Sequence, residues 1–121
     1  MNLVDSSGWL SFFAGDKNAD YFGAIITDTD SLLVPTLCMV EVARVFMRQN
    51  SGSIYQALAV MQQGMVIPLN QDLVVLTAIT GQRYRLALAD AIIYATAQAQ
   101  NAILWTQDKH FKDLPRVNYT D

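Results

Sequence analysis

Cysteine, histidine and glutamate are almost missing from this sequence of 121 residues. Cys38 is the only cysteine and His110 the only histidine, so the chain can assemble neither a disulfide framework nor a structural zinc site. Cys38 lies in an apolar run and is expected to be a small buried side chain. A single cysteine fits a reducing, cytoplasmic setting.

Charge is also scarce. Charged residues make up 16% of the chain and hydrophobic residues 52%, whereas the usual charged share is about 25%. This balance excludes intrinsic disorder and predicts that some apolar surface is covered by a partner or a second copy. The net charge of −3 argues against a broad basic face for nucleic acid. No segment has the pattern of a signal peptide or a membrane span, so we expect a soluble protein without membrane contact.

Apolar strands alternate with longer helices, which predicts a single α/β domain over residues 1–121. Strands are expected at 2–6, 32–34, 65–69, 102–106 and 117–119. Helices are expected at 9–13, 17–26, 36–49, 51–63, 71–80 and 87–100, with Asp16 and Ser51 as N-caps of the second and fourth. This order implies right-handed crossovers and a mainly parallel sheet with helices on both faces. Functional groups of such sheets collect at the carboxyl ends of the strands.

Four carboxylates stand in unusual places. Asp5 and Asp108 follow two strands, at or just beyond their carboxyl ends. Glu41, the only glutamate, and Asp90 interrupt apolar helices, where a charge is costly unless it is paired or bound to a metal. Each acid alone also has a structural explanation. Asp5 and Asp108 can cap the turns that follow them, Asp90 can interact with a helix dipole, and Glu41 can pair with Arg44.

All four acids can meet at one edge of a parallel sheet. Two carboxylates about 5 Å apart repel each other by roughly 3 kcal/mol at an effective dielectric constant near 20. Four together would therefore either protonate in part or bind a divalent cation. Oxygen ligands favour Mg²⁺ or Mn²⁺ over zinc or copper. Sites of this composition serve hydrolysis or group transfer at phosphorus.

Four segments in register resemble the PIN-domain nucleases, and among them the VapC-type toxins of bacterial and archaeal toxin–antitoxin pairs. The segments are Val4–Ser7, Val40–Val45, Leu88–Ile93 and Leu104–Phe111, and the resemblance covers essentially the whole chain. It implies a three-layer α/β/α PIN-like domain with a mainly parallel central sheet. It also implies an endoribonuclease dependent on Mg²⁺ or Mn²⁺, acting as the toxin that inhibits translation, with a cognate antitoxin, a homodimer, and a transfer or ribosomal RNA target.

The resemblance also assigns roles to individual residues. Asp5, Glu41 and Asp90 match the three most constant acids of the family, and Asp108 matches the fourth. By this match Asp5 and Asp90 hold the first metal. Asp108 and Glu41 position a second metal or the attacking water, with Asp108 as a further metal ligand. Two small hydroxyl residues of the pattern would support these acids: Ser6 and Thr106.

Basic residues near the acids are few. Arg44 and Arg48 share a helix stripe with Glu41, and they either grip RNA phosphates or balance that acid. Lys109, on the loop after the last acid, is either a phosphate contact or a solvated side chain. Few cations imply weak, salt-dependent RNA binding, which favours recognition of a folded RNA by its shape. The near absence of charge over 36–63 predicts a surface covered by a second copy or an antitoxin segment.

Other functions fit the residues less well. A response-regulator receiver needs adjacent acids after the first strand, a middle strand-end aspartate and a lysine after the fifth strand, whereas Asp5 is followed by two serines. A phosphatase of the haloacid dehalogenase type needs Asp-x-Asp there, which Ser7 breaks. Neither Ser6 nor Ser7 has the glycine pattern of a nucleophile elbow, so His110 is expected to be a polar loop residue. The sequence does not separate a toxin from a PIN nuclease of RNA processing.

Overall fold

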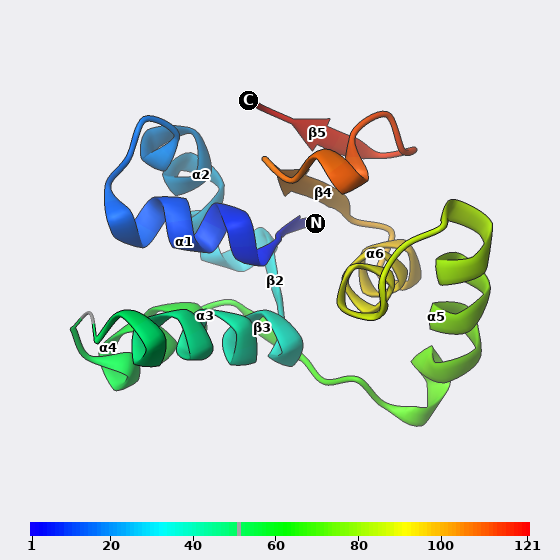
Figure 1. Ribbon diagram of the computed structural model, residues 1–121, viewed down its shortest axis with the longest axis horizontal. Helices are drawn as coiled ribbons and strands as arrows, with labels where there is room; N and C mark the ends of the chain where they lie inside the picture. Colours follow the sequence, from blue (N-terminus) through cyan, green and yellow to red (C-terminus); the bar gives the residue numbers. More distant parts are fainter. Residues whose placement is uncertain (51) are drawn as a thin grey trace.

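The computed structural model describes residues 1–50 and 52–121. Within these ranges, five strands form one sheet in the order β3-β2-β1-β4-β5 (Figure 1). The strands are β1 (Asn2–Val4), β2 (Leu32–Pro35), β3 (Met65–Ile67), β4 (Ile103–Thr106) and β5 (Val117–Tyr119). Every neighbouring pair is parallel, which confirms the expected parallel sheet.

Helices connect the strands and flank the sheet. They are α1 (Ser6–Ala14), α2 (Ala19–Ile26), α3 (Thr36–Gln49), α4 (Ile54–Met61), α5 (Gln71–Tyr84) and α6 (Leu88–Ala99), with short 3-10 turns η1 (Thr29–Ser31) and η2 (Lys109–Phe111). In Figure 1 the pairs α1–α2 and α5–α6 lie on opposite sides of the strands, as right-handed crossovers require. This is the three-layer α/β/α arrangement that was expected. None of the helices in the described ranges is long and apolar enough to span a bilayer.

The sequence predicts Asp16 and Ser51 as N-caps, and the structure describes only the first of them. Asp16 does not cap α2, because α2 begins at Ala19 with Asn18 before it. The Asp16 carboxylate instead accepts hydrogen bonds from the Ser11 hydroxyl and the Asn18 N–H, which closes the turn between α1 and α2. Ser51 lies outside the described residues. The helix expected after it, α4, begins at Ile54, and its N-cap is Ser53.

Helix α5 runs past Gly81, where the sequence predicts its end, and continues to Tyr84. A Cβ placed on Gly81 would lie 3.2 Å from the Cβ of Ala91 in α6. Glycine at this position therefore lets α5 and α6 pack closely, and the helix ends where Arg85 adopts a left-handed conformation with φ of 56°.

The core surrounds the central strands, whose carboxyl ends carry the candidate site. Leu3 and Val4 of β1 are fully buried. A Cβ placed on Gly8 would lie 2.5 Å from Cγ1 of Val4, so only glycine lets the first turn of α1 lie against β1. Cys38 is fully buried, as expected. This packing fixes the start of α1 at the point where β1 ends.

Candidate active site

Asp5 directly follows the central strand β1 and is the N-cap of α1. Its Oδ1 accepts hydrogen bonds from the Ser7 hydroxyl at 2.7 Å and the Gly8 N–H at 3.1 Å, and its Oδ2 accepts one from the Thr106 hydroxyl at 2.7 Å. Burial raises the pKa of Asp5 to about 6, although these three bonds favour the charged form, and the negative charge of Asp108 adds to the rise. Asp5 is thus both a helix cap and a buried acid with a raised pKa, a combination that is common in functional sites.

Thr106 joins two of the acids. Val4 pairs with Trp105 across the neighbouring strands β1 and β4, so the residues that follow each strand lie side by side. The Thr106 hydroxyl donates to Asp5 and accepts from the Asp108 N–H at 2.9 Å. Asp108 in turn caps η2, because its Oδ1 accepts from the N–H of His110 at 2.9 Å. The supporting role expected of Thr106 therefore has a physical basis in one shared hydroxyl.

Glu41 is held by α1 and not by its own helix. The Ser6 hydroxyl donates a hydrogen bond of 2.6 Å to Oε1 of Glu41. The alternative explanation, an ion pair between Glu41 and Arg44, is not seen in the described part of the chain, where the two ion-pair contacts both involve His110. Burial raises the pKa of the Cys38 thiol, and the nearby charges of Asp5 and Glu41 act in the same direction. Both acids therefore stand close to the buried side chain of Cys38 in α3.

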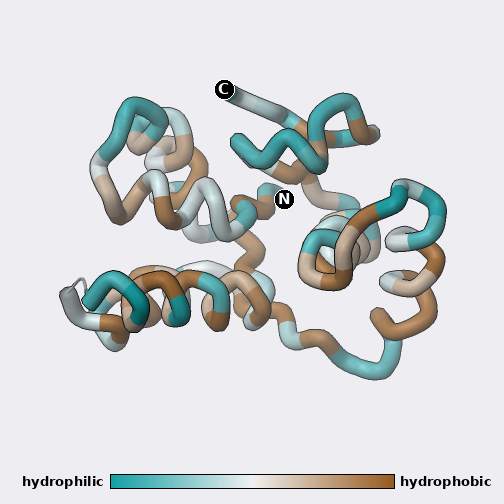
Figure 2. Tube along the Cα trace, viewed as in Figure 1, coloured by the Kyte–Doolittle hydropathy of each residue, from teal (hydrophilic) through white to brown (hydrophobic). Residues whose placement is uncertain are grey.

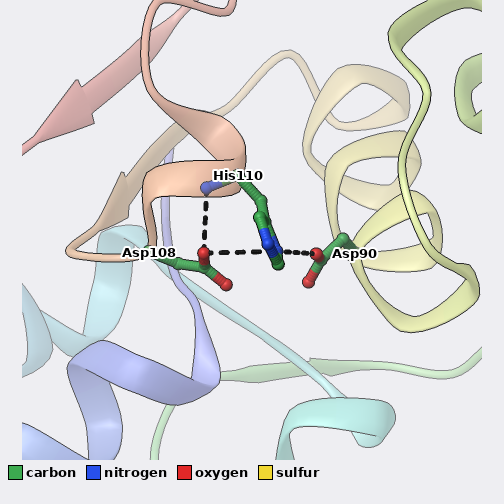
Figure 3. Close-up of side chains that lie close together, drawn as sticks. All are labelled: Asp90, Asp108 and His110. Carbon is green, nitrogen blue, oxygen red and sulfur yellow. Dashed lines mark hydrogen bonds and ion pairs between the residues drawn. The ribbon is translucent and has the colours of Figure 1, made fainter.

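Asp90, Asp108 and His110 form a compact set of side chains that could hold a metal ion (Figure 3). Nδ1 of His110 lies 3.0 Å from Oδ2 of Asp90 and 3.4 Å from Oδ1 of Asp108. One ligand atom from each residue lies within 4.8 Å of the other two. Burial raises the pKa of Asp90, against the hydrogen bond from His110. That hydrogen bond, followed by the charge of Asp108, raises the pKa of His110.

His110 is the residue that the sequence argument missed. It was expected to be a polar loop side chain, and its imidazole is indeed largely exposed at 71%, but it lies between two of the four acids. The available signal was its place two residues after Asp108. Asp108 caps the 3-10 turn η2, and the cap bond from the His110 N–H keeps the two residues together.

The predicted site residues therefore fall into two connected groups. Asp5 caps α1 and is held by Ser7 and Thr106, and Glu41 of α3 is bonded to Ser6 in the first turn of α1. Asp90 and Asp108 lie with His110, and Thr106 connects the groups through its bond from the Asp108 N–H. The expected substrate contacts are on the surface: Arg44, Arg48 and Lys109 are all exposed.

The donor set fits a hard divalent cation. Asp90 and Asp108 offer carboxylate oxygens within 4.8 Å of each other, and their side chains are 17% and 31% exposed. Asp5 is buried beside Asp108, whose charge affects its pKa. Carboxylate oxygens that are partly open to water are typical ligands of Mg²⁺ and Mn²⁺. Of the three acids predicted as metal ligands, Asp90 and Asp108 belong to the group that could hold an ion, whereas Asp5 is buried outside that group.

Comparison with known proteins gives a family and a set of related structures. A family model described as PIN domain matches residues 3–117. No curated protein matches the sequence. A toxin–antitoxin complex from Klebsiella pneumoniae has 24% identity and a TM-score of 0.83, with 98% of this chain and 96% of that chain covered.

Two further structures share the fold at lower identity. VapC20 from Mycobacterium tuberculosis, described as a toxin that cleaves the sarcin–ricin loop, has 16% identity and a TM-score of 0.73, with 100% of both chains covered. VapBC2 from Rickettsia felis, bound to a DNA fragment from its promoter, has 12% identity and a TM-score of 0.71, covering 99% of this chain and 98% of that chain. These likenesses confirm the predicted fold over the full length of the chain.

Proposed function

The chain belongs to the PIN-domain family, and from this premise we propose that it is a metal-dependent endoribonuclease that hydrolyses phosphodiester bonds of RNA. The observation that carries the proposal is the chain of hydrogen bonds that links Asp5, Asp108 and Asp90 through Thr106 and His110 at the carboxyl edge of the sheet. Glu41 is bonded to Ser6, the residue that follows Asp5. Carboxylates gathered in this way fit a hydrolytic centre that acts at phosphorus.

Asp5, Asp90 and Asp108 would hold Mg²⁺ or Mn²⁺ there. When bound, such a cation lowers the pKa of a water molecule and stabilises negative charge on the phosphate. The protein's own part is to keep these carboxylates in place: Asp5 through three hydrogen bonds, and Asp108 through the turn that it caps. Preorganised charge of this kind is a large contribution to catalysis.

Glu41 would orient the attacking water and accept its proton. Ser6 holds Oε1, and no hydrogen bond within residues 1–50 and 52–121 engages Oε2. The water oxygen forms a bond to phosphorus, the bond from phosphorus to the leaving oxygen breaks, and the proton of the water passes to the carboxylate. A fixed carboxylate with one free oxygen suits this general-base role.

The substrate would be a folded RNA, with transfer and ribosomal RNA as the candidates. Arg44, Arg48 and Lys109 are exposed and would contact its phosphates. Because few cations take part, we expect binding to weaken steeply as salt rises. Such an enzyme acts where these RNAs are, in the cytoplasm.

A toxin that inhibits translation needs an antitoxin, and a groove of about 900 Å³ would receive a segment of it. The groove lies between α1, α3 and α4, and apolar side chains form much of its wall: Leu10, Phe13, Val45, Phe46 and Val60. Ser7 and Gln107, which adjoin two of the acids, also line it. An antitoxin segment seated there would reach the edge of the active site. The toxin–antitoxin assemblies among the related structures support this assignment.

A homodimer would form through α5. Helix α5 exposes Val75 and Ile79 at 67% and 55%, and Figure 2 colours much of this helix as hydrophobic. These two lie on one stripe with Asp72 at the start of the helix and Arg83 at its end. Two copies packed antiparallel would bury the apolar pair and place each Asp72 against the partner's Arg83. Such a self-complementary contact is what a two-fold dimer needs.

RNA cleavage by the purified protein tests the proposal. Ribosomal and transfer RNA are incubated with wild type, Asp90→Asn, Glu41→Gln and Asp113→Asn, each with Mn²⁺ and with EDTA. We expect discrete fragments from wild type with Mn²⁺ and none with EDTA. Asp90→Asn and Glu41→Gln should cut at least about 100-fold more slowly, whereas Asp113→Asn removes an exposed carboxylate and should cut normally. Equal cleavage by all four proteins would contradict the proposal.

A further inference from the structure

The 3-10 turn η2 fixes the position of His110. Its backbone N–H donates to Asp108 at 2.9 Å, and its neighbour Phe111 is fully buried. The ring of Phe111 packs against that of Tyr94, with 6.3 Å between the centroids, and the Tyr94 hydroxyl donates to the carbonyl of Pro115 at 2.7 Å. Although its imidazole is exposed, His110 is therefore anchored to the core through the next residue.

The spacing of the three side chains matches that of ligands around one ion. In an octahedral site with bonds of about 2.1–2.2 Å, adjacent ligand atoms are about 3.0 Å apart. Nδ1 of His110 lies 3.0 Å from Asp90 Oδ2 and 3.4 Å from Asp108 Oδ1. Figure 3 shows the imidazole edge between the two carboxylates, which come from α6 and from the loop after β4. Small side-chain shifts would bring all three donors to a common ion.

We propose that His110 supplies a nitrogen ligand to the cation held by Asp90 and Asp108. The inference rests on the proposed metal-dependent function and adds a residue outside the four acids. It has a consequence for the identity of the metal. Mg²⁺ takes oxygen ligands almost exclusively, whereas transition ions accept imidazole readily. A site with one imidazole should therefore prefer Mn²⁺ to Mg²⁺ more strongly than a site built from carboxylates alone.

The single histidine makes a direct spectroscopic test available. Untagged full-length protein is loaded with one equivalent of Mn²⁺, and pulsed electron paramagnetic resonance records the electron spin echo modulation from ¹⁴N. A directly bound imidazole gives a strong coupling, and in this chain His110 is the only residue that can provide it. His110→Ala is compared with Asp113→Asn, an exposed change three residues along the same loop. Calorimetry measures the dissociation constants for Mn²⁺ and Mg²⁺ in each protein.

We expect ¹⁴N modulation in wild type and in Asp113→Asn, and none in His110→Ala. The variant should bind Mn²⁺ at least about tenfold more weakly, with a smaller change for Mg²⁺. If wild type binds Mn²⁺ without ¹⁴N modulation, or if His110→Ala keeps the wild-type Mn²⁺ affinity, the inference is wrong while the metal-dependent function stands. If wild type binds neither ion, the proposed function fails together with the inference.

Discussion

The hydroxyl of Thr106 donates a hydrogen bond of 2.7 Å to Oδ2 of Asp5. The two residues stand 101 positions apart in the chain and meet because β1 and β4 are neighbours in the sheet. The same hydroxyl accepts from the Asp108 N–H, so one oxygen atom sets the relative placement of two acids.

Thr106→Val should remove the hydrogen bonds that link Asp5 and Asp108 through this hydroxyl. The substitution leaves Oδ2 of Asp5 and the N–H of Asp108 without this partner, which should lower the free energy of unfolding by about 1–3 kcal/mol. The pKa of Asp5 should rise further, because the bond from Thr106 favours the charged form. Urea unfolding at pH 7 in EDTA measures the change. Thr106→Ser keeps the hydroxyl and should stay within about 1 kcal/mol of wild type; a loss in Thr106→Ser as large as that in Thr106→Val would contradict the assignment of the effect to the hydroxyl.

The free energy of unfolding should fall as pH rises when divalent cations are absent. The pKa of Asp5 is about 6 in the folded chain, against 3.8 for an unperturbed carboxyl. Protonation of Asp5 therefore contributes to the free energy of unfolding in full below pH 3.8, and this contribution is lost as pH rises through 6. The total loss is about 3 kcal/mol. The raised pKa values of Asp90 and His110 act in the same direction.

Urea midpoints between pH 4 and 7 in EDTA check this dependence. Asp5→Asn cannot titrate at this position and should show a shallower slope than wild type over that range. Saturating Mn²⁺ should flatten the wild-type slope as well, because a bound cation favours the ionised carboxylates. Parallel slopes for wild type and Asp5→Asn would show that the burial of Asp5 does not control the dependence.

Ile79→Glu should convert the dimer to a monomer without unfolding it. Ile79 is 55% exposed within one chain, but in the proposed dimer each copy would bury a charge in an apolar contact. The dissociation constant should rise at least about 100-fold, as measured by light scattering over a concentration series. Met47→Glu is the matched control, because Met47 is 70% exposed on α3 and lies outside the α5 stripe. A monomeric wild type, or equal weakening by both variants, would remove α5 as the dimer surface.

Ala14→Arg should block the groove. Ala14 is exposed at the end of α1 and lines the groove, so a long side chain there fills the space without entering the core. We expect at least about tenfold weaker binding of the cognate antitoxin, measured by calorimetry, with RNA cleavage unchanged. Ala59→Arg, on an exposed position of α4 outside the groove lining, should bind as wild type does. Normal antitoxin binding by Ala14→Arg would place the antitoxin elsewhere.

Much of the fold could be predicted from the sequence because strand and helix patterns are local. The strands at Leu32–Pro35 and Val117–Tyr119 and the helix at Thr36–Gln49 lie where their apolar patterns indicate. Boundaries that depend on tertiary contacts were less accessible. Gly81 carries the signal of a helix end, yet its packing against Ala91 keeps it inside α5. Asp16 carries the signal of an N-cap, but the partner that it accepts from is Ser11 in the preceding helix.

The candidate site also has a part that the sequence predicts and a part that it does not. That acids would lie at the carboxyl edge of the sheet follows from parallel topology, and Asp5 and Asp108 are there. The partner of each acid does not follow from spacing along the chain. Glu41 has an arginine three residues away, but the hydroxyl of Ser6 from another helix is its hydrogen-bond donor. His110 was underestimated for a related reason, because the 3-10 turn that brings it back toward Asp108 gives no periodic signal.

The strand order has a consequence for biosynthesis. β1 is the first strand to be made, but it lies at the centre of the sheet, and its neighbour β4 begins only at Ile103. While the ribosome is still translating the intervening segment, Asp5 has neither Thr106 nor Asp108 beside it. A growing chain therefore carries Asp5 without these two hydrogen-bonding neighbours until β4 and the loop after it have been made.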